Sequence, residues 1–130
     1  MRIPSSYHPV STRAAASAIV GQWVNTESSA VLTIVHVDDP APQLAVSYEL
    51  GRVRRRYPKA LDAKRTMVVT VPGAVEAELM QLRSDGSQVS VLAAQAADGS
   101  VHVFKAACPV AYVDAEAEVM AAFFGSVALV

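Results

Sequence analysis

Two Asp-Gly pairs constrain this chain most strongly, because each lies between segments in which apolar and polar residues alternate. The pairs occur in Ser84-Asp85-Gly86-Ser87 and in Asp98-Gly99. Asp-Gly readily supplies the positive φ angles that a tight hairpin turn requires. The segments 75–80, 89–93 and 101–105 are therefore predicted to be antiparallel strands joined by two successive hairpins.

The same period of two runs through most of the chain after residue 18. Glycines and prolines interrupt it at intervals of about ten residues, which is typical of short strands joined by short turns. Eight strands suffice to close a barrel whose interior holds side chains or one small ligand. We therefore predict an all-β fold, a small up-and-down barrel of about eight strands. The predicted strands are residues 19–25, 31–37, 44–50, 53–57, 67–71, 75–80, 89–93 and 101–105.

The two ends of the chain have a different character. Residues 1–18 contain Pro4 and Pro9 and are predicted to form an N-terminal arm. Residues 114–126 are predicted to form a C-terminal helix, because Asp114 can cap its start and acidic residues follow in its first turn. The apolar side chains of this helix need a surface to pack against. The chain thus divides into the arm and a single barrel domain over residues 19–130.

The first predicted strand carries the pattern Gly21-x-Trp23-x-Asn25, with Ser29 four residues later. This pattern resembles the first strand of the calycin barrels, a group that includes avidins and lipocalins. The resemblance implies that Trp23 lies buried across one end of a barrel. The likeness to avidins implies that Asn25, Ser29 and a following Tyr48 bind a ligand. Avidins wall their pocket with several tryptophans and Trp23 is alone here, so the resemblance implies a ligand site but not biotin.

Basic residues are concentrated in one segment. Seven of the eleven lysines and arginines lie in residues 52–65, with a single acid among them. Arg52, Arg54 and Arg56 share one face of the predicted strand. Two interpretations are open. Charge on an edge strand prevents pairing between molecules, and arginine forks also bind phosphate, carboxylate or a nucleic-acid backbone.

No motif in the chain indicates catalysis, a metal or a cofactor, so we expect a protein that is not an enzyme. His8, His36 and His102 are far apart, and only the last two lie on predicted strands where they could converge. A metal site needs three or four ligands, and none is predicted. Cys108 is the only cysteine. It is expected to be a small buried hydrophobe and favours a reducing, cytoplasmic compartment.

These observations predict a non-enzymatic binding protein that holds a small apolar or amphipathic ligand in the barrel. With 52% hydrophobic and 18% charged residues, the chain is rich in apolar side chains, and we expect a homo-oligomer. The alternative is a structural, coat-type subunit that binds RNA or another polyanion through residues 52–65, although a net charge of −1 does not favour nucleic acid.

No secretion signal and no membrane span are expected, because the longest apolar run, 119–130, is shorter than the roughly 20 residues that a span needs.

Overall fold

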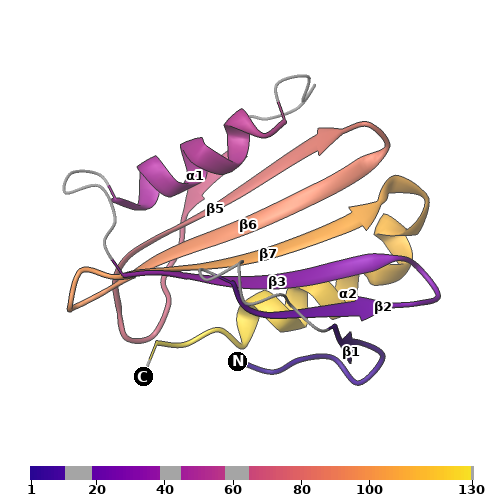
Figure 1. Cartoon of the computed structure of the whole chain (residues 1–130), viewed down its shortest axis with the longest axis horizontal. Helices are drawn as coiled ribbons and strands as arrows, with labels where there is room; N and C mark the ends of the chain where they lie inside the picture. The colour runs from indigo at the N-terminus through magenta and orange to yellow at the C-terminus, as the bar shows by residue number, and fades with distance from the viewer. Residues whose placement is uncertain (11–18, 39–44, 58–64, 130) are drawn as a thin grey trace.

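An open antiparallel sheet forms the centre of the molecule (Figure 1). The computed structural model describes residues 1–10, 19–38, 45–57 and 65–129. In these residues the sheet has seven strands in the order β1-β2-β3-β7-β6-β5-β4. The strands are β1 (His8–Pro9), β2 (Ile19–Asn25), β3 (Ala30–Val37), β4 (Arg65–Val68), β5 (Ala74–Ser84), β6 (Ser87–Ala96) and β7 (Val101–Pro109).

The sheet-rich fold agrees with the prediction, but the described sheet is open and does not close into the predicted barrel. β1 and β4 are the two edges of the described sheet and do not pair with each other. β1 comes from the segment expected to be an arm, pairing with β2 so that Pro9 lies opposite Trp23. The rest of that predicted arm, residues 11–18, lies outside the described residues. An open sheet has two faces rather than an enclosed lumen, so helices have to cover its apolar side chains.

Both Asp-Gly hairpins are confirmed. Ser84 lies opposite Ser87 at the β5–β6 turn, and Asp85 and Gly86 have φ angles of 50° and 77°. The β6–β7 turn is longer, with residues 97–100 between the strands, and there Gly99 alone has a positive φ, of 91°. These left-handed conformations favour glycine.

The prediction of strands at 44–50 and 53–57 is wrong. Residues Ala45–Arg55 form helix α1. Val46, Leu50 and Val53 are buried, and their spacing of four and three residues is that of one helix face. The apolar residues of this segment also alternate with a period of two, so the pattern fits a strand as well as a helix. Gly51, expected to turn the chain, lies inside the helix.

The predicted C-terminal helix is present as α2 (Val113–Gly125), after a short 3₁₀ turn η1 (Val110–Tyr112). Asp114 lies in its first turn rather than at its N-cap position, which Tyr112 occupies. Phe123 is fully buried and Val127 nearly so. The surface that the apolar side chains of this helix were expected to need is thus provided in part by the chain itself. None of the described helices has the length and apolar character that crossing a membrane requires.

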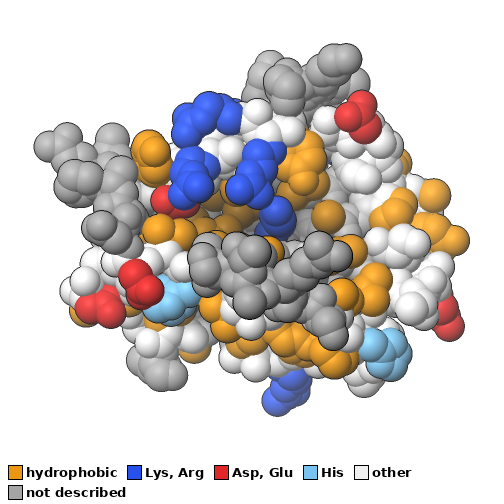
Figure 2. Space-filling model, viewed as in Figure 1, with side chains coloured by type: hydrophobic (Ala, Val, Ile, Leu, Met, Phe, Trp, Pro, Cys, Tyr) orange, Lys and Arg blue, Asp and Glu red, His pale blue; other side chains and the backbone are white. Residues whose placement is uncertain are grey.

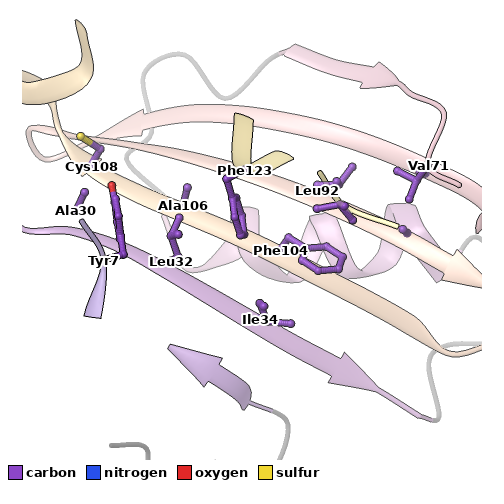
Figure 3. Packing of buried hydrophobic residues seen from close by; sticks show 13 residues of the cluster. Tyr7, Ala30, Leu32, Ile34, Val71, Leu92, Phe104, Ala106, Cys108 and Phe123 are labelled. Atoms are coloured by element: carbon purple, nitrogen blue, oxygen red, sulfur yellow. The ribbon is translucent and has the colours of Figure 1, made fainter. Parts of the chain in front are cut away.

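The two helices cover opposite faces of the sheet, because alternate residues of β6 belong to different cores. Leu92 and Ala94 pack with α2, whereas Val91 and Ala93 pack with α1. β6 is therefore buried on both sides. In the α2 core, Phe123 lies among the side chains of Leu92, Phe104 and Ala106 (Figure 3).

Trp23 is half-buried at the edge of the α2 core and does not plug a barrel. Its ring lies over Gly21, where a β-carbon would be 2.5 Å from the ring atom Cη2. Residues two apart on a strand share a face, so the ring can fold back along the strand only if the earlier residue has no side chain. The Gly-x-Trp pattern is explained by this local packing.

Candidate functional site

A hollow of about 360 Å³ lies between α2 and the adjoining strands β5, β6 and β7. The sheet side of the hollow is formed by side chains that point to the α2 face, and the other side by successive turns of the helix. The sheet contributes Leu79, Gln81, Gln88, Ser90, Ala106 and Cys108, and the helix contributes Val113, Glu116, Ala117, Met120, Ala121 and Phe124.

The lining is polar at one end and apolar at the other. The register places Gln88 and Cys108 side by side, one step nearer the β5–β6 turn than the row of Gln81, Ser90 and Ala106. The start of α2 lies at this same end, because the N–H of Val110 donates to the carbonyl of Gly86 over 2.8 Å. Further from the turn the lining becomes apolar, with Leu79 on the sheet and Met120 and Phe124 on the helix.

Glu116 is the buried acid of the site and connects three parts of the chain. Its Oε1 accepts a hydrogen bond of 2.8 Å from Nδ2 of Asn25, and its Oε2 accepts one of 3.0 Å from the hydroxyl of Tyr7. All three side chains are buried. Burial, and then the hydrogen bond to Glu116, raise the pKa of Tyr7 above its ordinary value. Tyr7 therefore remains a neutral donor at neutral pH.

Cys108 is buried in the polar end of the hollow, as the sequence predicted for a small hydrophobe. Burial, and then the nearby carboxylate of Glu116, raise the pKa of its thiol. The thiol is therefore protonated at neutral pH, and a thiol is a weak nucleophile compared with a thiolate.

The structure does not bring together the three ligand residues implied by the calycin resemblance. Asn25 reaches the α2 face, where Glu116 and the N–H of Glu27 engage its amide group. Ser29 is exposed in the following turn with a φ of 62°. Tyr48 is exposed on α1, the helix on the opposite face of the sheet.

The arginines predicted to line one strand face lie instead at the end of α1. Arg52 and Arg54 are in the helix and Arg56 follows it, all with exposed side chains. Lys and Arg side chains gather into one patch over α1 (Figure 2). The three arginines do not share a single face, because side chains two residues apart on a helix point to different faces, but all three lie at the same end of α1.

His36 and His102 converge, as the strand pattern suggested. They lie opposite each other on β3 and β7 with stacked rings whose centroids are 4.4 Å apart. Nε2 of His36 lies 3.2 Å from Oδ1 of Asp38 without the alignment of a hydrogen bond. Burial, and then His36, lower the pKa of His102. Within the described ranges, no three His, Cys, Asp or Glu side chains are grouped so as to hold a metal ion.

Neither known protein families nor curated protein sequences match this chain. The candidate site therefore stands on its own geometry. Sequence reasoning noted Glu116 only as a first-turn acid and did not single out the glutamines. One signal was present: Glu116, Met120 and Phe123 are spaced by four and three residues. This spacing places a carboxylate on the apolar face of the helix.

Proposed function

We propose that the protein is a non-enzymatic binding protein for a small amphipathic molecule held between α2 and the sheet. The observation that carries this proposal is the hollow of about 360 Å³ with a polar and an apolar end. Ligand pockets commonly measure about 300–1,000 Å³ and combine an apolar lining with a few polar groups that fix orientation. The site replaces the barrel lumen expected from the sequence.

The lining favours a ligand with a neutral, hydrogen-bonding head and a short apolar tail. The amides of Gln81 and Gln88 and the hydroxyl of Ser90 can donate and accept hydrogen bonds at the polar end. Glu116 would disfavour an anionic head group, because the ligand would bring a second negative charge beside a buried carboxylate. The tail would lie against Leu79, Met120 and Phe124.

Binding rather than catalysis fits the groups that line the hollow. Its one thiol, Cys108, is kept protonated, and no histidine contributes to the lining. A cysteine nucleophile is normally activated by a neighbouring base or by a lowered pKa. The pKa of Cys108 is raised rather than lowered, and both carboxylate oxygens of the nearby Glu116 already accept hydrogen bonds from Tyr7 and Asn25.

The test is a titration with 1-monodecanoylglycerol, a neutral amphiphile, followed by NMR and compared with decanoate. We expect saturable binding of the neutral probe and weaker binding of the anion. Ala121 lines the hollow and is also exposed, so Ala121→Trp should obstruct it and reduce binding. Ala122 is exposed on the same helix without lining the hollow, so Ala122→Trp is the matched control. Equal binding by both variants, or none by the unmodified protein, would refute the proposal.

Native mass spectrometry of freshly purified protein adds an independent measurement. It reports a retained small molecule and tests the expected homo-oligomer in the same spectrum. The coat-type alternative predicts large particles with the ultraviolet absorbance of RNA. A discrete small species without that absorbance agrees with the binding protein and excludes the coat subunit.

A further inference from the structure

The face of the molecule opposite the hollow carries a concentration of positive charge. Figure 2 shows Lys and Arg side chains gathered over α1. We define the cationic patch as the arginines at the end of α1 together with the lysine on the sheet face that this helix covers: Arg52, Arg54, Arg55, Arg56 and Lys105. In the described part of the chain, the one carboxylate paired with it is Glu49, whose Oε2 lies 3.3 Å from Nη1 of Arg52. The five cations and Glu49 sum to +4, on a chain whose net charge is −1. The charge of the molecule is thus strongly segregated.

Lys105 sets this patch apart from an ordinary solvated helix end. It lies in the middle of β7, between Thr33 of β3 and Val91 of β6, and its side chain is half-buried. Burial, and then the nearby charge of Arg56, lower its pKa. Holding a partly desolvated ammonium group beside a guanidinium group is unfavourable unless an anion neutralises both.

The arginines of α1 can be explained without a ligand, but Lys105 cannot be explained in the same way. Cations at the end of a helix interact favourably with the partial negative charge of the last carbonyl groups. Arg52, Arg54 and Arg55 lie in the last turn and meet that condition. Lys105 belongs to a different element. It lies beside Val91 on the sheet face that α1 covers, and its charge acts on that of Arg56, so two elements contribute cations to one face.

The distance between the arginines of the cationic patch indicates the size of the anion that can bind there. Arg56 follows α1, and its N–H donates to the carbonyl of Val53 over 3.0 Å, so the helical turn continues through it. The backbone positions of Arg52 and Arg56, four residues apart, are therefore separated by about one turn, or roughly 6 Å along the axis. That span suits two or three adjacent phosphate groups. It is short for a nucleic-acid strand, which needs a groove lined with cations and stacking aromatic rings over several nucleotides.

We propose that the cationic patch is a binding site for a small oligophosphate, with Lys105, Arg56 and Arg52 as the contacting residues. The guanidinium forks would bind phosphate oxygens in pairs, and the ammonium group would act as a point charge beneath them. This site is separate from the proposed hollow, because the sheet lies between them.

The experiment titrates the full chain with tripolyphosphate in phosphate-free buffer by isothermal titration calorimetry. We expect binding that weakens with added salt, because exposed charges are screened beyond about 8 Å at physiological ionic strength. Lys105→Met and Arg56→Gln should each weaken binding about tenfold or more, the usual effect of losing a charged hydrogen bond. Arg83→Gln is the matched control, since Arg83 is exposed at the β5–β6 hairpin and bonds to Gln88.

A second measurement separates a binding role from a structural one. Without ligand, Lys105→Met should raise the melting temperature, because it removes an uncompensated charge from beside Arg56. With saturating tripolyphosphate, the unmodified protein should gain thermal stability and the variant should not. A purely structural lysine would give a lower melting temperature in both conditions, and that result would overturn the proposal.

Two further arms test other sources of phosphate. Short single-stranded RNA and vesicles of phosphatidylglycerol are titrated under the same conditions. Binding of either one without binding of tripolyphosphate would overturn the proposal in favour of a nucleic-acid or a membrane surface. Tripolyphosphate binding that is equal in Lys105→Met, Arg56→Gln and Arg83→Gln would also overturn it.

Discussion

Replacing Glu116 tests the buried polar cluster directly, because one carboxylate accepts hydrogen bonds from two buried donors. Glu116→Leu places an apolar side chain of similar size in the helix and removes both carboxylate oxygens, which are the two acceptors. Tyr7 is only 4% exposed and Asn25 only 7% exposed in the unmodified protein. In the variant, the donors that bonded to Glu116 would therefore be buried without an acceptor. An unsatisfied buried donor costs about 1–3 kcal/mol. The two together predict a loss of about 2–6 kcal/mol in the free energy of unfolding.

Glu116→Gln should cost much less. Its amide oxygen can still accept from Asn25, and its amide nitrogen can donate to the Tyr7 hydroxyl oxygen, so only the Tyr7 O–H loses its acceptor. The remaining loss comes from this one orphaned donor and from the missing negative charge in the first turn of α2, about 1–3 kcal/mol in all. Glu118 is exposed on the same helix, so Glu118→Leu should change stability little.

The assay is urea-induced unfolding, from which the free energies of the three variants are compared with that of the unmodified protein. A double-mutant cycle with Tyr7→Phe measures the coupling between Tyr7 and Glu116. Tyr7→Phe should recover part of the loss caused by Glu116→Leu, because it removes one orphaned donor. Equal losses for the Leu and Gln variants, or a coupling near zero, would refute the reasoning.

Three further predictions concern single positions. Gly21→Ala places a methyl group against the Trp23 ring and should cost about 1–3 kcal/mol, a loss that Trp23→Leu in the same chain should abolish in urea unfolding. Phe123→Ala empties the centre of the α2 core and should cost about 3–5 kcal/mol, seen as a lower melting temperature. The pKa of Tyr7 is raised in the folded chain, so the unfolded chain releases that proton first and stability falls as the pH rises past about 10. In Tyr7→Phe, the free energy of unfolding should fall less steeply above this pH. The same slope of unfolding free energy against pH in the variant and in the unmodified protein would contradict this prediction.

Local chemistry made part of the fold readable from the sequence. The Asp85-Gly86 turn depends on two positive φ angles that few other residue pairs adopt, and the β6–β7 turn depends on one, at Gly99, so both hairpins were predictable. Helix α2 was predictable from its first-turn acids and its apolar spacing. The convergence of His36 and His102 followed from placing each on a strand.

The sites were less predictable than the hairpins. The hydrogen bond between Tyr7 and Glu116 joins residues 109 positions apart. Nothing in the neighbourhood of either residue encodes such a contact. The concentration of basic residues was visible in the sequence, but the approach of Lys105 to Arg56 depends on how α1 lies across the sheet.

What the sequence by itself determined are the features that a few neighbouring residues can specify: the tight turns, the alternating strands around them and the C-terminal helix. Only the tertiary structure decided whether residues 45–55 became strand or helix, because their apolar residues satisfy both periods. The decision rests on Val46, Leu50 and Val53 packing against the α1 face of the sheet. Once a helix covers that face, burial of the apolar side chains no longer requires the sheet to close on itself.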